Sequence, residues 1–239
     1  MNNTTNTEHK VSERYLNKEY LETNPGWHKD DSEWKSEQII KLLKKNKITL
    51  SDLCEVGCGA GEVLSCLYKK DISKIADGYD VSPSAIEICK LKETGNLKYF
   101  LKDISEIKKN YDCLLCIDVF EHVEDYIGFV RSLKPLANYK VFHIPLDISI
   151  GSIVFDWMTY ARKSVGHLHY FTTETALQTL EEADIEVLDY FYTAPFLINN
   201  KKKSLKGHII NNLRRFLFLL SPAFLSKTLG GCSLIVLAR

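Results

Sequence analysis

Residues 53–62, with the sequence LCEVGCGAGE, decide how this chain folds. An apolar segment runs into three glycines at alternating positions, Gly57, Gly59 and Gly61, and a helix-like run over residues 63–70 follows. Glycine lets the backbone turn sharply and approach a ligand without a side chain in the way. The N-terminus of the following helix points unpaired N–H groups at the same place. The stretch therefore predicts a strand, a ligand-binding turn and a helix.

A carboxylate follows at the end of the next apolar segment. Residues 78–82 read GYDVS, which places Asp80 nineteen residues after Gly61. A glycine-rich turn followed about twenty residues later by an acidic residue is typical of a site that holds the ribose hydroxyls of a nucleoside. The sequence thus predicts a nucleoside-containing cofactor.

The spacing of the glycines discriminates between nucleoside cofactors. A nicotinamide dinucleotide needs a third glycine at the position where this chain has Glu62. Glu55 stands just before the first glycine, which is unfavourable beside a pyrophosphate and favourable beside a cation. S-adenosylmethionine carries a sulfonium and an ammonium and has no phosphate. The residues therefore favour S-adenosylmethionine over a dinucleotide.

Two further segments end in acidic residues. Residues 99–104, YFLKDI, place Asp103 after a third apolar run, and residues 111–123, YDCLLCIDVFEHV, carry a fourth run into Asp118. With these four motifs in this order, the sequence resembles the class I S-adenosylmethionine-dependent methyltransferases. It is similar in particular to the small-molecule branch, which includes ubiquinone-pathway, sugar and natural-product methyltransferases.

The resemblance implies a role for each motif in holding the cofactor. The glycine turn would line the methionine moiety, Asp80 would hold the ribose hydroxyls, and Asp103 would accept a hydrogen bond from the adenine amino group. Residues after the fourth strand would close the pocket. The implied cofactor-binding residues are Glu55, Gly57, Cys58, Gly59, Gly61, Asp80, Val81, Asp103, Ile104, Asp118 and Val119.

The order of apolar segments predicts an α/β fold. Strands and helices alternate along the chain, as they do in parallel sheets covered by helices. The resemblance implies a Rossmann-like seven-stranded, mostly parallel sheet with an antiparallel last strand beside the fifth and helices on both faces. Strands are predicted near 52–56, 75–80, 97–101, 113–118, 139–145, 186–192 and 232–239, and helices near 61–70, 83–93, 124–134, 148–161 and 174–183.

The N-terminal region predicts a tail and a lid. Residues 1–12 are polar and predict a disordered tail, and residues 13–47 predict a helical lid. Trp27 and His28 lie in a turn-rich loop and resemble the lid of related methyltransferases, where they would cover the cofactor and place an aromatic ring beside the sulfonium. Residues 48–239 would form the methyltransferase domain.

Three histidines are candidates for proton removal from a hydroxyl acceptor. His122 follows the fourth predicted strand, and His167 and His169 lie in a loop that the resemblance brings to the same edge of the sheet. An imidazole titrates near neutral pH and suits a general base. Each of the three can instead be a structural histidine that bonds to the backbone.

The composition indicates which kinds of partner and which cellular compartment to expect. Lys and Arg number 31 and Asp and Glu number 31, so no excess of positive charge favours nucleic acid as a partner. Seven cysteines without a disulfide pattern, and no leader-like N-terminus, predict a reduced, cytoplasmic protein. Cys113 and Cys116 would point to opposite faces of a strand, so no metal site is expected there.

Residues 194–231 are predicted to be an insertion between the last two strands. Residues 201–206, KKKSLK, are basic, and an apolar run over 209–225 follows them. One interpretation is that the insertion packs on the sheet or lines the acceptor pocket. The other is that residues 201–225 contact a membrane or a lipid-linked acceptor, since basic residues beside an apolar helix suit an anionic surface.

The combined prediction is S-adenosylmethionine-dependent methylation of a small molecule. The acceptor is expected to be a hydroxyl of a sugar, a phenol or a natural product. Methylation of an amine or a carboxylate is an alternative, as is a non-catalytic protein that binds the cofactor and activates a partner. A nicotinamide-dependent dehydrogenase is disfavoured by Glu62 and Glu55.

Overall fold

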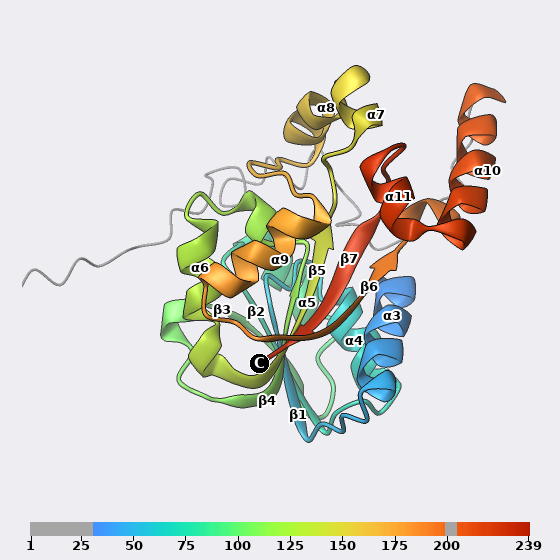
Figure 1. The fold of residues 1–239 in the computed structure, drawn as a ribbon. Coiled ribbons are helices and arrows are strands. Elements are labelled where there is room, and N and C mark those ends of the chain that lie inside the picture. The colour runs from blue at the N-terminus through green and yellow to red at the C-terminus, as the bar shows by residue number, and fades with distance from the viewer. Residues whose placement is uncertain (1–30, 199–204) are drawn as a thin grey trace, which may run out of the picture.

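A computed structural model describes residues 31–198 and 205–239. Its centre is a seven-stranded sheet with the strand order β3-β2-β1-β4-β5-β7-β6 (Figure 1). The strands are β1 (Asp52–Val56), β2 (Ile75–Asp80), β3 (Leu97–Leu101), β4 (Tyr111–Ile117), β5 (Ala137–Pro145), β6 (Val187–Thr193) and β7 (Ser233–Ala238).

The pairing of the strands confirms the predicted fold class. Strands β1 to β5 pair in parallel with one another. Strand β7 lies between β5 and β6 and runs antiparallel to both. The chain order reverses direction across the sheet between β1 and β4. Such a switch point is where open α/β sheets bind ligands, at the carboxyl ends of the strands.

Helices cover both faces of the sheet (Figure 1). The first face carries α3 (Ser32–Lys45), α4 (Glu62–Lys69) and α5 (Pro83–Lys90). The second carries α6 (Tyr126–Ser132), α9 (Thr173–Glu182) and α11 (Pro222–Lys227). Helix α3 packs through Ile39, Leu42 and Leu43, which recur at helical spacing and are buried against the sheet.

Alternate residues of each strand face opposite sides, as the pleat requires. In β4, Cys116 packs in the core on one face, whereas Cys113 packs in the core on the other. The expectation that these two thiols cannot share a ligand is therefore confirmed.

Two differences between the predicted and the observed elements have a cause in the backbone. The single helix predicted over residues 148–161 is two helices, α7 (Ile150–Val154) and α8 (Trp157–Ser164), because Asp156 between them has φ +54°. An aspartate tolerates this left-handed conformation, so an apolar sequence pattern does not reveal the break. The fourth strand ends at Ile117, because Asp118 also has a positive φ, of +53°.

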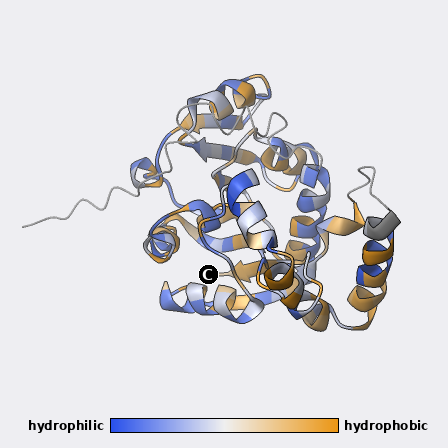
Figure 2. Cartoon of the chain, turned by 90° about the horizontal axis from the view of Figure 1, so that it is seen from above, coloured by the Kyte–Doolittle hydropathy of each residue, from blue (hydrophilic) through white to orange (hydrophobic). Residues whose placement is uncertain are grey.

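The described residues between β6 and β7 form a short turn, Pro195–Leu197, then α10 (Leu205–Leu220) and α11. Pro222 occupies the first turn of α11 and separates it from α10. Helix α10 projects from the sheet, and Figure 2 shows it largely in the hydrophobic colours. The predicted tail over 1–12 and the first part of the predicted lid, with Trp27 and His28, lie outside the described residues.

Among the helices that the structure describes, none combines the length and the apolar character that crossing a bilayer requires.

Candidate functional site

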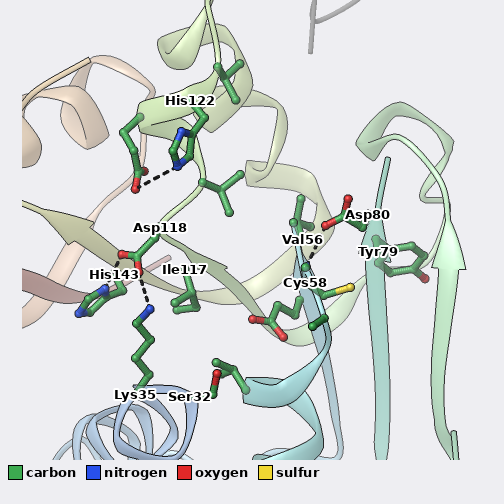
Figure 3. Close-up of a pocket in the computed structure, with 18 of the residues that line it drawn as sticks. Ser32, Lys35, Val56, Cys58, Tyr79, Asp80, Ile117, Asp118, His122 and His143 are labelled. Atoms are coloured by element: carbon green, nitrogen blue, oxygen red, sulfur yellow. Dashed lines mark hydrogen bonds and ion pairs between the residues drawn. The ribbon is translucent and has the colours of Figure 1, made fainter. Parts of the chain in front are cut away.

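A cavity of about 380 Å³ opens at the carboxyl ends of the central strands. It collects most of the residues that the sequence assigned to the cofactor, and two of the three predicted bases. Figure 3 shows Cys58, Asp80 and Asp118 with His122 around this cavity. The predicted residues that line it are Glu55, Gly57, Cys58, Gly59, Asp80, Val81, Asp103, Ile104, Asp118, Val119, His122 and His167.

The turn after β1 needs glycine at Gly57. This residue has φ +69°, and a Cβ atom there would lie 2.6 Å from Cγ2 of Val119. The next glycine, Gly59, donates its N–H to Asp80 at 2.8 Å. The turn is thus tied to the end of β2, and both glycines face the cavity.

Gly61 serves packing rather than the cavity surface. It is not among the residues that line the cavity. Its carbonyl accepts a hydrogen bond of 2.7 Å from the hydroxyl of Tyr99, and a Cβ atom on Gly61 would lie 2.6 Å from that ring. The glycine lets α4 approach β3 closely at the start of the helix.

Asp80 is held by two backbone N–H groups. Gly59 donates to one carboxylate oxygen and Ser82 to the other, each at 2.8 Å. Burial raises the pKa of Asp80 to about 6, and these backbone hydrogen bonds oppose the rise. The carboxylate is therefore fixed in position and can still accept hydrogen bonds from hydroxyls in the cavity.

Asp103 and Ile104 form the far wall of the cavity. Asp103 accepts a hydrogen bond of 2.9 Å from the N–H of Ser105 and caps the 3-10 turn Ile104–Glu106. This turn places a carboxylate and a buried apolar side chain together at the end of β3.

Glu55 leaves a polar atom unsatisfied at the cavity wall. The residue is 3 % exposed, and its Oε2 has no hydrogen-bond partner among the described residues. Burial raises its pKa to about 8, although the N–H of Leu64 and the charge of Lys35 oppose the rise. An orphaned carboxylate oxygen fits a cationic ligand, and with Gly57 and Asp80 it forms a cradle that suits S-adenosylmethionine.

Asp118 links helix α3 to the sheet. Its carboxylate lies between Lys35 of α3, at 2.7 Å from Nζ, and His143 of β5, at 2.6 Å from Nδ1 (Figure 3). Asp31 contacts the same lysine at 3.0 Å. Burial alone would raise the pKa of Asp118, but the imidazole of His143 and the ammonium of Lys35 hold it well below its usual range.

The sequence did not reveal this network. His143 is buried, lines the cavity and pairs in register with Ile117 beside Asp118. Lys35 belongs to a helix eighty-three positions before Asp118, and no sequence pattern connects the two.

Glu121, His122 and His167 meet at one end of the cavity. Glu121 is fully buried, and neither carboxylate oxygen has a hydrogen-bond partner among the described residues. Nδ1 of His122 lies 3.1 Å from the carbonyl oxygen of Gly166. Nδ1 of His167 lies 2.5 Å from the carboxylate of Asp147. The two ring centroids lie 4.9 Å apart. The sequence had not singled out Glu121.

His169 faces another direction. Its Nε2 lies 3.2 Å from the carbonyl oxygen of Glu124, and its ring packs on Tyr126 with a centroid distance of 4.3 Å. It does not line the cavity. Of the three predicted bases, His122 and His167 are the two that reach the candidate site.

Most of the chain that forms this cavity matches a known protein family. The family model described as "Methyltransferase domain" matches residues 27–190, which is more than half of the chain. The match begins before α3 and ends in β6. It therefore includes the carboxyl ends of β1 to β5, around which the cavity lies.

Two curated relatives align with part of the chain. Malonyl-[acyl-carrier protein] O-methyltransferase 1 of Ilyobacter polytropus is 26% identical over 134 residues, which cover 54% of this chain and 44% of the relative. Ubiquinone biosynthesis O-methyltransferase of Rickettsia canadensis is 33% identical over 104 residues, which cover 41% of this chain and 43% of the relative. The chain spans about half the length of the curated relatives it matches.

A solved structure has the same fold. Magnesium protoporphyrin IX methyltransferase from Synechocystis PCC 6803, with bound S-adenosylhomocysteine, superposes with a TM-score of 0.58 at 15% identity. The match covers 86% of this chain and 82% of that one.

We predict that Lys35→Met destabilises the protein. The substitution leaves the Asp118 carboxylate with His143 alone, and removing one partner of a largely buried ion pair costs roughly 2–4 kcal/mol of unfolding free energy. Urea unfolding followed by circular dichroism measures the change. Lys44→Met on the exposed side of α3 is the control and should change stability by less than about 0.5 kcal/mol. Equal effects would mean that the bridge contributes nothing.

We predict that acid weakens cofactor binding through Asp80. With a pKa of about 6, the carboxyl is ionised at pH 7 and binds hydroxyl donors, and it becomes protonated as the pH falls. The affinity for S-adenosylhomocysteine should therefore fall more steeply below about pH 6, by up to about tenfold per pH unit. Calorimetry across pH 5 to 8 measures this, and Asp80→Asn should remove the steeper part. A variant with the wild-type profile would exclude Asp80 from the site.

Proposed function

This chain belongs to the methyltransferase domain family, and we propose that it transfers a methyl group from S-adenosylmethionine to a hydroxyl of a small-molecule acceptor. The observation that carries the proposal is one cavity with two chemically different ends. The glycine turn, Glu55 and Asp80 form the end that suits the cofactor, and Glu121, His122 and His167 form the other. Both relatives are O-methyltransferases by name, which favours oxygen as the acceptor atom.

The chemistry requires the acceptor oxygen to be held and deprotonated. When bound, S-adenosylmethionine supplies a methyl group whose bond to sulfur breaks, with its electron pair going to sulfur, as the acceptor oxygen forms the new bond to carbon. Asp80 and Glu55 would fix the cofactor so that this carbon faces the second end of the cavity. Positioning of this kind supplies much of the rate of a displacement reaction.

The second end of the cavity is suited to a hydroxyl. The imidazoles of His122 and His167 and the carboxylate of Glu121 surround one small space. Such groups accept a hydrogen bond from a hydroxyl and assist removal of its proton. An amine or a carboxylate acceptor would need no such assistance, and these remain the alternative acceptors.

A second cavity suggests where the rest of the acceptor lies. It has a volume of about 560 Å³, borders the first at Pro145, Pro195 and Ser233, and extends between α8 and α10. Arg214 lines it, stacks over Trp157 at 5.2 Å and donates to the carbonyl of Leu229 at 2.7 Å. Its Nε has no hydrogen-bond partner among the described residues. We assign Arg214 to an anionic group of the acceptor.

The segment over residues 201–227 has a composition that suits an anionic membrane or a lipid-linked acceptor. In sequence it contains seven lysines and arginines, one of which, Arg214, lines the second cavity, and no acidic residue. Helix α10 exposes large apolar side chains, with Leu219 84 % exposed and Phe216 58 % exposed. Positive charge beside an exposed apolar face is the combination that binds anionic bilayers. The second cavity would then receive an acceptor from that surface.

We predict that methylation depends on His167 and His122 but that cofactor binding does not. The full chain is incubated with labelled S-adenosylmethionine and a metabolite extract of its source organism, and methylated products are identified by mass spectrometry. His167→Ala and His122→Ala should each lower the rate by about 10²–10⁴ with little change in S-adenosylhomocysteine affinity.

His169, which does not line the cavity and bonds to the carbonyl of Glu124, provides the matched control, and His169→Ala should keep the wild-type rate. Products methylated on nitrogen or on a carboxylate, or full activity in both cavity variants, would contradict a hydroxyl acceptor at this place. Absence of any labelled product together with normal cofactor binding would favour a non-catalytic partner protein.

We predict binding to anionic vesicles through α10. Co-sedimentation with phosphatidylcholine vesicles containing about 30 % phosphatidylserine should retain the protein, and pure phosphatidylcholine should retain little, because each basic residue near an anionic surface adds about 1 kcal/mol. Arg215→Glu and Leu219→Asp should each reduce retention. Lys98→Glu, on the far edge of the sheet, is the control for charge alone. Retention that is equal for both lipid compositions, or unaffected by the α10 variants, would refute membrane contact.

A further inference from the structure

The cluster of Glu121, His122 and His167 has the composition and geometry of a metal site. We propose that these three side chains bind one divalent first-row transition-metal ion such as Zn²⁺ or Co²⁺ at the acceptor end of the cavity. Each residue offers one donor atom, and these atoms all lie within 4.8 Å of one another. The role of the ion in catalysis rests on the proposed methyl transfer, whereas binding of the ion to the three side chains does not.

Glu121 is the first reason for the proposal. It has no exposed surface, and both of its oxygens lack a hydrogen-bond partner among the described residues while the residue lines the cavity. An ionised carboxylate that is buried without a partner costs several kcal/mol, so the group either keeps a proton or binds a positive charge. The neighbouring imidazole Nε2 of His122 lies 4.0 Å away, beyond hydrogen-bond distance. A cation between them would satisfy the carboxylate.

The orientation of the two imidazoles is the second reason. Nδ1 of His167 is bonded to the Asp147 carboxylate, and Nδ1 of His122 to the carbonyl of Gly166. Metal-binding histidines in proteins almost always use one ring nitrogen in this way and bind the ion with the other. The arrangement therefore assigns Nε2 of each ring to the proposed ion.

The backbone holds the three ligands together. The carbonyl oxygen of Glu121 accepts hydrogen bonds from the N–H groups of Leu168, at 2.8 Å, and His169, at 3.0 Å. These bonds join the loop that carries His167 to the 3-10 turn Phe120–His122. The ligands come from segments that are far apart in the sequence but fixed to each other at the site.

The donor set selects the kind of ion. A cation about 2.1 Å from each donor holds the donors about 3–4 Å apart, so the donor–donor distances, now within 4.8 Å, need to shorten by up to about 1–2 Å. Two imidazoles and one carboxylate, with remaining positions open to a cavity, are typical of catalytic zinc and of non-haem iron sites. Mg²⁺ prefers oxygen ligands and octahedral geometry, and it is disfavoured.

The ion would act on the acceptor hydroxyl. A hydroxyl bound to a divalent transition metal has a lowered pKa and releases its proton to water. The resulting alkoxide retains the electron pair that forms the new bond to the methyl carbon. In this reaction His122 and His167 hold the ion and do not themselves take the proton.

Metal binding can be measured without cofactor or acceptor. The full chain is stripped with a chelator and titrated with Co²⁺, whose visible absorption reports nitrogen and oxygen ligation, and with Zn²⁺ by calorimetry. We expect one ion per chain. Glu121→Gln and His167→Ala should each weaken binding by at least about 100-fold, and Asp147→Asn, which removes the support of His167, by about 10–100-fold. His208→Ala on the exposed face of α10 should bind as wild type does.

Thermal unfolding separates a metal ligand from a structural residue. Zn²⁺ should raise the melting temperature of the wild type, since a ligand that binds the folded state stabilises it. Metal-free Glu121→Gln should melt no lower than the metal-free wild type, and Zn²⁺ should no longer raise its melting temperature. If Glu121→Gln does not fold, His167→Ala decides in the same two assays.

Two results would overturn the proposal: absence of Co²⁺ and Zn²⁺ binding by the wild type, or binding that is unchanged in both Glu121→Gln and His167→Ala. Either result leaves the proposed methyl transfer intact, because the titration contains neither substrate. Conversely, a bound ion in a protein that transfers no methyl group would leave the metal site standing and remove its assigned role.

Discussion

Carboxylates gather around one cavity at the carboxyl edge of the sheet, and the site depends on how the charge of each is balanced. Asp118 is compensated within the protein by Lys35 and His143. Asp80 accepts two backbone N–H groups. Glu55 and Glu121 are buried with carboxylate oxygens that no described residue satisfies. Since unpaired buried charge is costly, the fold leaves two places for positive ligands: the cationic cofactor beside Glu55 and the proposed metal ion beside Glu121.

The order of the strands and the residues at their ends could be predicted from the sequence, because each motif is a local pattern: glycines at alternating positions, then an acid after an apolar run. Lys35 and Glu121 could not be found in this way. The function of Lys35 depends on a contact across the sheet edge, and Glu121 differs from an ordinary surface glutamate only through its complete burial. The break at Asp156 was missed because it depends on one left-handed residue within an apolar run.

The two ends of the cavity are built from different kinds of element. The cofactor end is formed by the backbone of the glycine turn and by strand ends, with hydrogen bonds of 2.8 Å between Asp80 and the turn. The acceptor end is formed by loops joined at the Glu121 carbonyl and continues into a second cavity under α10. Acceptor selection would then depend on α8 and α10, which can vary without disturbing the cofactor cradle.

The most direct test of this account is a count of the protons released when S-adenosylhomocysteine binds. With a pKa of about 8, Glu55 is mostly protonated at pH 7. The ammonium of the bound ligand should favour the ionised carboxylate, so that Glu55 loses its proton when the ligand binds. Calorimetry in buffers of different ionisation enthalpy gives the number of protons. The account predicts release of close to one proton by the wild type and almost none by Glu55→Gln. Binding without proton release by the wild type would contradict the claim that a cationic ligand compensates this buried carboxylate.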